Sequence, residues 1–409
     1  MRRSHRSHFL FFLIFLLLPP GAAAASTKRS RPGRVQTGLD VLEALKFAPL
    51  KGKHVGLITN HTGLDTQEKT TIDRLAHAPG VTLVALFSPE HGLAGKLDAN
   101  VVASTKDPTT GLPVYSLYGE NKRPSDEMLN GIDALVFDIQ DAGVRFYTYT
   151  TTMGYCMEAA AKKGIAFYVL DRPNPIGGEI VEGPMLDDDK KSFVAYFPIP
   201  VRYGLTIGEL AQFYNAENHI GVELHVIQMK NWHRNYFYDS TGLRWVPPSP
   251  NLRTTKGAIL YPGLEIMQNA GVSVGRGTET PFEIFGAPWM DGEKVAAELN
   301  AKHLNGVRFV AQPLIPVSGL FAGQRCGGVS MKIGEKSAVR SLRVGLEIAA
   351  LLKKLYPDKV DLAKTITLLG NAATVQELQD GAPPEKIVAD WKDDLAAFET
   401  LRRKYLLYK

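Results

Sequence analysis

The sequence predicts an α/β fold built on a mostly parallel, doubly wound β-sheet. Four short apolar runs, at residues 54–59, 81–87, 132–137 and 165–170, are typical of buried strands. Helical spacing of apolar residues follows between or after these runs, at 70–77 and 150–163. Because strand, loop and helix largely alternate, we expect the strands to pair in parallel through right-handed crossovers.

The bulk composition is that of a globular protein with no bias toward nucleic acid. The 409 residues are 44% hydrophobic and 22% charged, which is enough for two to three domains. The net charge is +5, and Arg2, Arg3 and Arg6 supply three of those charges. The remainder is close to neutral, so nucleic acid is not an expected partner.

The two cysteines indicate neither a zinc site nor a disulfide framework. Cys156 and Cys326 are far apart in the chain and lie in no CxxC or Cys/His spacing. We expect two buried free thiols, with a single inter-domain disulfide as the alternative.

The N-terminus has the order of a secretory signal. Residues 1–8 are basic, 9–18 are continuously apolar, and 22–25 offer small residues for cleavage. We predict a signal peptide at 1–25 and a disordered leader at 26–36. The mature protein is then exported, periplasmic or extracellular, with no membrane span left after cleavage. A retained anchor is the alternative, although the apolar run is short for a bilayer.

The elements around the first four strands can be placed in order. A capped helix is expected within 35–45, before the first strand, and a turn at 198–204. A helix at 206–217 begins with Thr206 as N-cap and Glu209 three residues later, which is a capping box. A strand at 222–229 follows. The Pro-rich stretch 247–252 is a plausible hinge between two domains.

The C-terminal part is expected to mix helices and strands. Residues 271–278 form a Gly-rich loop around Arg276, which is either an anion-binding loop or a tight turn. Helices are predicted at 291–304 and 338–356, with strand-like segments across 307–332. A last helix is predicted over 384–408, because an apolar stripe recurs there at helical spacing, and we expect that stripe to be core.

The most informative feature is how the strands end. The first four strands run into polar loops that contain Asn60, Glu90, residues 138–145 and residues 171–174. In a parallel sheet these ends share one edge, where ligands bind, so the loops predict a composite site. The alternative is a set of ordinary charged connections, with Asp141 as a helix cap.

Known cofactor and nucleophile motifs are missing from the sequence. No GxGxxG, GxSxG or Walker A pattern occurs, so no dinucleotide or other cofactor is predicted. A metal site is an alternative, because His61, Glu90, His91 and Asp138 could converge, but no HExxH spacing occurs and no metal ligand is predicted.

The polar motifs occur in a distinctive order. They are residues 88–92 (SPEHG), 138–149 (DIQDAGVRFYTY), 171–175 (DRPNP), 248–251 (PSPN), 275–278 (GRGT), 281–283 (PFE) and 286–289 (GAPW). Together they resemble the NamZ family of exo-β-N-acetylmuramidases, glycoside hydrolase family 171, over nearly the whole mature chain. The resemblance implies a larger Rossmann-like catalytic domain, placed at 37–248. It also implies a smaller α+β C-terminal domain, at 249–409, that closes the active-site cleft.

The resemblance also implies a reaction and a substrate. The family releases N-acetylmuramic acid (MurNAc) from the non-reducing ends of peptidoglycan fragments freed of their peptides. For this chain it implies hydrolysis of the MurNAc-β-1,4-N-acetylglucosamine bond, with peptidoglycan-derived saccharides as partners. The oligomeric state is left open.

Glycoside hydrolysis needs a proton donor for the leaving oxygen and stabilisation of an oxocarbenium-like centre. Glu90 is the predicted general acid, because it stands alone at a strand end behind Pro89; a helix cap or salt bridge is its alternative role. Asp138 and Asp141 could position a water or the sugar's own acetamido group. Tyr147 or Tyr149 could supply the second catalytic group or a hydrogen bond, and Tyr147 is preferred for the catalytic role.

The remaining candidates are expected to bind substrate. An arginine is suited to the lactyl carboxylate of muramic acid, which makes Arg145, Arg172 and Arg276 candidates. The other predicted substrate-binding residues are Asn60, His91, Tyr149, Asn174 and Asn251.

The chain departs from the family pattern at Gln268 and Val274, where the family often carries carboxylates. This departure motivates an alternative function, a non-catalytic periplasmic protein that binds muropeptides or glycans. A third hypothesis is an esterase or deacetylase that acts on the same polymer. It is weaker, because Ser88 and His91 are too close in sequence for an obvious catalytic triad.

Overall fold

The computed structural model of the chain describes Met1 and residues 33–97 and 103–409. The predicted signal peptide and most of the predicted leader lie outside the described residues, as does the short stretch 98–102. Residues 34–409 form one compact unit by themselves.

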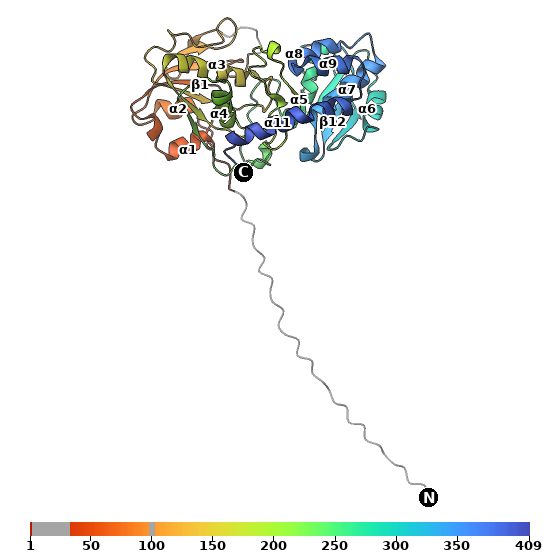
Figure 1. The fold of residues 1–409 in the computed structure, drawn as a ribbon, viewed down its shortest axis with the longest axis horizontal. Coiled ribbons are helices and arrows are strands. Elements are labelled where there is room, and N and C mark those ends of the chain that lie inside the picture. The colour runs from red at the N-terminus through yellow and green to blue at the C-terminus, as the bar shows by residue number, and fades with distance from the viewer. Residues whose placement is uncertain (2–32, 98–102) are drawn as a thin grey trace. The chain divides into compact units, whose positions relative to one another are not determined.

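A seven-stranded sheet organises the first part of this unit (Figure 1). Its strands are β1 (His54–Thr59), β2 (Thr82–Ser88), β3 (Thr105–Lys106), β4 (Pro113–Ser116), β5 (Ala134–Asp138), β6 (Ala166–Leu170) and β9 (Leu224–Ile227), in the order β3-β4-β2-β1-β5-β6-β9. All neighbours pair in parallel except β3 with β4. The predicted mostly parallel sheet is therefore confirmed.

The strand order is that of a Rossmann fold. Without the short antiparallel edge strand β3, the strands follow the sequence order 3-2-1-4-5-6. The order in which strands are added to the sheet reverses between the parallel strands β1 and β5, which is the switch point where such sheets bind ligands. The loops after β1, β2 and β5 all leave the sheet at this carboxyl edge.

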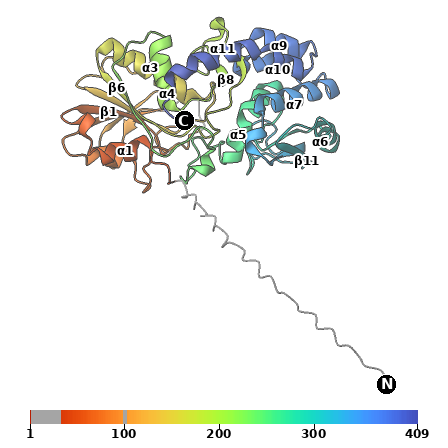
Figure 2. The same ribbon diagram turned by 60° about the horizontal axis from the view of Figure 1, so that its bottom comes forward.

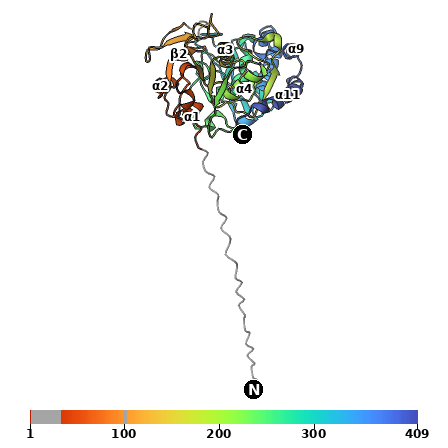
Figure 3. The ribbon, with the colours of Figure 1, turned by 60° about the vertical axis from the view of Figure 1, so that its left-hand side comes forward.

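Helices cover both faces of the sheet because the buried strands are apolar on both sides. On one face, α3 (Thr148–Lys163) and α4 (Ile207–Glu217) bury their apolar sides against Phe137 and Phe167. On the other face, α1 (Gly38–Ala44) packs against β6 and β9, and α2 (Thr71–Ala76) packs against β2 (Figure 3). The predicted capping box of Thr206 and Glu209 is confirmed at the start of α4.

The second part of the unit carries a small antiparallel sheet. Strands β10 (Ile284–Ala287), β12 (Gly327–Ile333) and β11 (Val307–Ala311) form it in that order, and β7 (Glu182–Met185) pairs separately with β8 (Pro200–Arg202). The helices of this second part are α5 (Thr255–Leu264), α6 (Gly292–Asn300), α7 (Ser341–Leu355), α8 (Ile366–Leu369), α9 (Ala372–Gln379), α10 (Pro384–Asp390) and α11 (Lys392–Arg402). Figure 2 shows α7, α9 and α10 close together. The predicted α+β character of this part is confirmed.

The single helix predicted over 384–408 is wrong. The chain forms α10 and α11 with a break at Trp391, and α11 ends at Arg402. The Trp391 indole is buried and donates to Thr374 Oγ1 of α9 at 2.9 Å. Phe398 instead packs against Phe213 of α4, with ring centroids 5.6 Å apart. A bend lets the two aromatic side chains reach partners on different elements.

Helix α5 is held against α7 by a contact between two glycines. A Cβ at Gly345 would lie 2.2 Å from the carbonyl oxygen of Gly263, and one at Gly263 would lie 1.7 Å from the carbonyl oxygen of Ser341. Real side chains do not tolerate such distances, so the backbones can approach this closely only because both positions are glycine. The crossing fixes α5, which carries Tyr261 into the candidate site.

Cys156 and Cys326 are both buried free thiols, as predicted. Within the described residues, no helix is long and apolar enough to cross a membrane.

Candidate active site

Glu90 lies where the sheet meets helix α3. Strand β2 ends at Ser88, and the half-buried Glu90 follows two residues later. Its Oε2 accepts a hydrogen bond of 2.6 Å from Thr148 Oγ1, and Thr148 is the first residue of α3. His91 then turns the chain with φ +69°, and its Nδ1 lies 2.6 Å from the carbonyl oxygen of Leu97. The loop is thus folded back on itself and presents the Glu90 carboxylate toward α3.

Tyr149 joins three strand-end segments. Asn60, directly after β1, donates from Nδ2 to the Tyr149 hydroxyl at 3.1 Å. The Tyr149 hydroxyl donates to the carbonyl oxygen of Pro248 at 2.6 Å and lies 3.5 Å from the backbone oxygen of Glu90. Asn60, Glu90 and Tyr149 are therefore brought together, as predicted from the strand ends, and the proline-rich segment joins them.

Aromatic rings form one wall beside these groups. Tyr147 meets Tyr149 edge-on at 4.8 Å between ring centroids, and Tyr261 of α5 lies 6.0 Å from Tyr147. Tyr261 also packs on Phe282 at 4.7 Å. Burial raises the pKa of Tyr147 and Tyr149 well above the usual tyrosine value, so both hydroxyls stay protonated at neutral pH.

Asp138 is held in a buried ion pair and not at an open site. Its carboxylate receives Arg172 Nε at 2.5 Å and Nη2 at 2.9 Å, and the Thr71 hydroxyl also donates to it. Both ionic side chains are almost fully buried. Arg172 further donates to the carbonyl oxygen of Leu64 at 3.0 Å. This geometry ties β5 to β6 and to the loop after β1.

Asp141 is buried with one oxygen occupied. Its Oδ2 accepts from Gly143 N at 2.7 Å and from the Tyr203 hydroxyl. Its Oδ1 has no hydrogen-bond partner among the described residues. Burial has the largest effect and raises the pKa of Asp141 to about 6, although the hydroxyl of Tyr203 and the backbone N–H groups of Gly143 and Ala142 lower it. Asp141 is thus a carboxyl group that can hold a proton near neutral pH.

Arg145 and Asn174 contact the backbone of other segments. Arg145 is buried and donates to four carbonyl oxygens, those of Pro184, Ile199, Leu368 and Leu369, at 2.5–3.0 Å. Asn174 donates from Nδ2 to the carbonyl oxygen of Leu205 at 2.8 Å and accepts from Ile176 N at 3.1 Å. Arg145 and Asn174 therefore hold separate segments of the chain together through hydrogen bonds to their backbones.

Arg276 lies in the Gly-rich loop beside the aromatic wall. Its Nη2 is 2.6 Å from Glu265 Oε1, and its guanidinium lies 5.3 Å from the ring of Phe282. The Arg276 side chain is 29% exposed, whereas that of Arg172 is 5% exposed. The loop itself is a tight turn, with Thr278 N donating to the carbonyl oxygen of Gly275 at 3.1 Å.

The electrostatic surroundings of Tyr261 link these groups. Its pKa is raised well above the usual value, first by burial and then by the charges of Glu265 and Glu90, while Arg276 lowers it. Glu90, on the loop after β2, and Arg276 therefore act on the same hydroxyl. Asn251 is buried in the proline-rich segment that Tyr149 holds.

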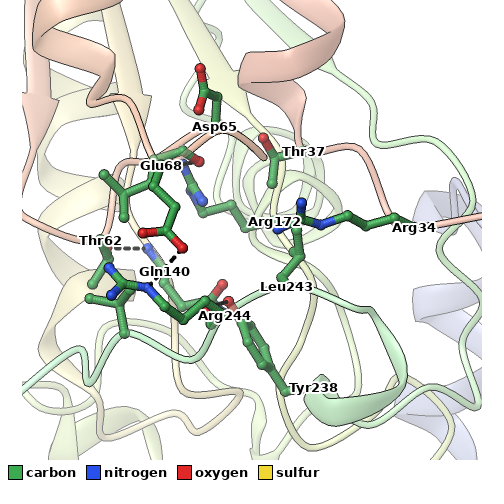
Figure 4. A pocket seen from close by; sticks show the side chains of 12 residues that line it. Arg34, Thr37, Thr62, Asp65, Glu68, Gln140, Arg172, Tyr238, Leu243 and Arg244 are labelled. Carbon is green, nitrogen blue, oxygen red and sulfur yellow. Dashed lines mark hydrogen bonds and ion pairs between the residues drawn. The ribbon is translucent and has the colours of Figure 1, made fainter.

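A small polar cavity also opens at the carboxyl edge, beside the ion pair of Asp138 (Figure 4). Thr62, Gln140 and Arg172 line it from the ends of β1, β5 and β6, and Arg244 pairs with Glu68 across it at 3.3 Å. Its volume is about 20 Å³, room for a single water and not for a sugar ring.

The residues that the structure describes contain no group of three or more His, Cys, Asp or Glu side chains placed to hold a metal ion.

The structure adds residues that the sequence patterns did not single out. Thr148 donates to Glu90, Tyr203 donates to Asp141, and Tyr261 reaches the site from α5. Thr148 lies inside a motif already quoted, but Tyr203 and Tyr261 sit in apolar surroundings that carry no local signal in the sequence.

Family models identify the family of the chain. The model of the N-terminal part of exo-β-N-acetylmuramidase NamZ matches residues 55–256, and the model of the C-terminal part matches residues 259–408. The chain belongs to the NamZ family of exo-β-N-acetylmuramidases. It is thus a glycoside hydrolase by family, as the motif order predicted.

One curated relative is similar over almost the full length. The peptidoglycan β-N-acetylmuramidase NamZ of Bacillus subtilis strain 168 is 42% identical over 395 residues, which cover 95% of each chain. Two solved structures of DUF1343 family proteins from Bacteroides fragilis share the fold. One has a TM-score of 0.86 at 41% identity and the other 0.77 at 31%, each over 92% of this chain and 99% of its own.

Proposed function

We propose that the chain hydrolyses the non-reducing-end MurNAc-β-1,4-N-acetylglucosamine bond of peptide-free peptidoglycan fragments, with Glu90 as the general acid. The NamZ family supports the reaction class, and the name of the Bacillus subtilis relative supports peptidoglycan as the polymer. The predicted signal peptide fits a cell-wall substrate, and export remains part of the proposal.

One observation carries the assignment of Glu90. Of the three carboxyl groups predicted to take part in catalysis, Asp138 is neutralised by Arg172 and Asp141 is buried. Glu90 is half-buried, and its carboxylate accepts a hydrogen bond from the Thr148 hydroxyl. A general acid must reach the glycosidic oxygen and exchange its proton with solvent, and the position of Glu90 allows both.

The other groups around Glu90 are proposed to act as donors and supports. Tyr147 stays protonated, so it can donate a hydrogen bond to the sugar but is a poor nucleophile. Asp141 can hold a proton near pH 6, and its Oδ1 can accept from the acetamido group of the sugar if the substrate reaches it. Asp138 is reassigned to holding the strand ends in place.

The lactyl carboxylate of muramic acid is proposed to contact Arg276. A bidentate grip needs guanidinium N–H groups that reach solvent. Arg145 is directed at four carbonyl oxygens and Arg172 at Asp138. Arg276 also pairs with Glu265, at 2.6 Å, but it lies beside Tyr261 and is the most exposed of the three side chains.

The first test is turnover of two chromogenic substrates by the purified mature protein. Release of nitrophenol from nitrophenyl β-N-acetylmuraminide, but not from the glucosaminide, would support both the reaction and recognition of the lactyl group. Release of MurNAc from peptide-free but not peptide-bearing fragments would support the finer substrate assignment. No turnover of any of these substrates would contradict the proposal.

A further inference from the structure

His61 contacts the proline-rich segment through one ring nitrogen. It follows Asn60 after strand β1, and its Nε2 lies 2.8 Å from the carbonyl oxygen of Pro247. A carbonyl oxygen can only accept, so Nε2 carries the proton and donates it. In this tautomer the other nitrogen, Nδ1, is unprotonated.

The same ring packs directly against the loop that carries Glu90. A Cβ built on Gly95 would lie 1.8 Å from His61 Cε1 and 2.1 Å from Nδ1, and Gly95 has φ +63°. The loop is closed by hydrogen bonds from Gly92 N to Pro89 O at 3.0 Å and from Gly95 N to Gly92 O at 3.1 Å. The imidazole therefore occupies the space that a side chain at position 95 would need.

His61 thus touches two segments that flank the candidate site. On one side lies the loop of residues 88–97, here called the Glu90 loop. On the other lies the proline-rich segment, which Tyr149 also holds through the Pro248 carbonyl oxygen at 2.6 Å. Of these contacts, the His61 ring is the one whose charge can change within the physiological pH range.

We propose that His61 is a positioning residue whose neutral imidazole holds the Glu90 loop against Pro247, and whose protonation loosens that arrangement. The reason lies at Nδ1, which is buried and has no hydrogen-bond partner among the described residues. A proton there would be a buried N–H without an acceptor, which is costly. The inference rests on the proposed role of Glu90 as acid.

The neighbouring charges also disfavour protonation of His61. His91 and Lys96, both on the Glu90 loop, face His61 as the neighbouring cationic groups. Burial lowers the pKa of His61 most, these two groups lower it further, and only the contact with Pro247 raises it. The neutral form is therefore favoured down to pH values below the usual histidine range.

The test compares His61→Gln with His61→Ala. The glutamine amide can donate to the Pro247 carbonyl oxygen but does not titrate, whereas alanine removes the contact. We expect His61→Ala to lower kcat about 10- to 100-fold with a smaller change in KM, since a loosened loop misplaces the acid. His61→Gln should keep most of the activity at pH 7 and lose less of it than the wild type as the pH falls below 6. His77→Gln is the control, because His77 is an exposed histidine at the C-terminal end of α2.

Hydrogen exchange of the Glu90 loop separates this inference from the proposed function, because it needs no substrate. The amides of Gly92, Gly95 and Leu97 are hydrogen-bonded within the loop and should exchange faster in His61→Ala. After correction for intrinsic rates, they should also exchange faster at pH 5 than at pH 8 in the wild type but not in His61→Gln. Unchanged exchange in all variants would overturn the inference even if the enzyme is active.

A double substitution tests the contact itself. Gly95→Ala should lower kcat strongly alone, and its effect should shrink in the His61→Ala background, because the clash with the ring is gone. Gly111→Ala is the matched control, since Gly111 has φ +72° but nothing within 4 Å of a Cβ. Additive effects of Gly95→Ala and His61→Ala would overturn the inference.

Discussion

Replacement of Asp138 by asparagine decides whether this carboxylate has a structural or a catalytic role. Asp138 is fully buried and receives two hydrogen bonds from Arg172, at 2.5 and 2.9 Å, and one from Thr71. Asparagine has the same shape but no charge, so it leaves the Arg172 cation buried and unpaired. Breaking a buried ion pair in this way costs about 3–5 kcal/mol.

The cost can be converted into a shift in melting temperature. A unit of roughly 380 residues has an unfolding entropy near 0.8 kcal/mol per degree, so this loss lowers Tm by about 4–6 °C. The assay is differential scanning calorimetry with turnover measured on the same samples. The double variant Asp138→Leu/Arg172→Met should regain much of the Tm, because it leaves no charge without a partner.

Turnover distinguishes a structural role of Asp138 from a catalytic one. With a structural role, Asp138→Asn should retain measurable activity well below its lowered Tm. An Asp138→Asn variant with wild-type Tm and activity reduced by orders of magnitude would refute the structural assignment and return Asp138 to catalysis.

Three further predictions follow from particular contacts. Arg276→Ala should lower kcat/KM for the muraminide about 10- to 100-fold but hardly change any residual turnover of the glucosaminide, and equal losses would argue against carboxylate recognition. Burial raises the pKa of Asp171 from 3.8 to about 7, so between pH 4 and 7 the folded state keeps a proton that the unfolded state has lost. The urea concentration at the midpoint of unfolding should therefore fall as the pH rises from 4 to 7. It should fall more in the wild type than in Asp171→Asn. An equal pH dependence of the urea midpoint in the two proteins would refute this role of Asp171. Gly345→Ala should destabilise the protein by about 1–3 kcal/mol through its clash with Gly263, whereas Gly334→Ala, where the nearest atom to a Cβ is 4.0 Å away, should cost less in a chemical unfolding experiment.

Much of the fold could be predicted because its signals are local. The apolar runs at β1, β2, β5 and β6 are long enough to mark buried parallel strands, and Thr206 with Glu209 marks a helix start. Short strands such as β3 and β4 carry little local signal, and the break at Trp391 depends on Thr374, a partner on another helix.

The candidate site was predictable to the level of the sheet edge and not beyond it. Glu90, Asn60 and Tyr149 do converge, because parallel strands deliver their ends to one edge. The sequence predicted catalytic roles for both Glu90 and Asp138, since both follow an apolar strand. What separates them is Arg172, whose pairing with Asp138 is set by tertiary structure alone.

The arginines show the same limit. Each could be assigned to a substrate carboxylate by its chemistry, but Arg145 is surrounded by four carbonyl oxygens contributed by distant parts of the chain. Leu368 and Leu369 are more than 220 residues away in the sequence. No local pattern at Arg145 reports such partners.

The most direct test of the account compares Glu90→Gln on two leaving groups, with Glu293→Gln, an exposed glutamate on α6, as the control. A sugar leaving group needs a proton from the general acid, whereas nitrophenolate leaves without one. We predict that Glu90→Gln lowers kcat for MurNAc-N-acetylglucosamine about 10²- to 10⁴-fold at an unchanged Tm. The loss on nitrophenyl β-N-acetylmuraminide should be far smaller. Equal losses on the two substrates, or near wild-type rates on both, would contradict Glu90 as the general acid.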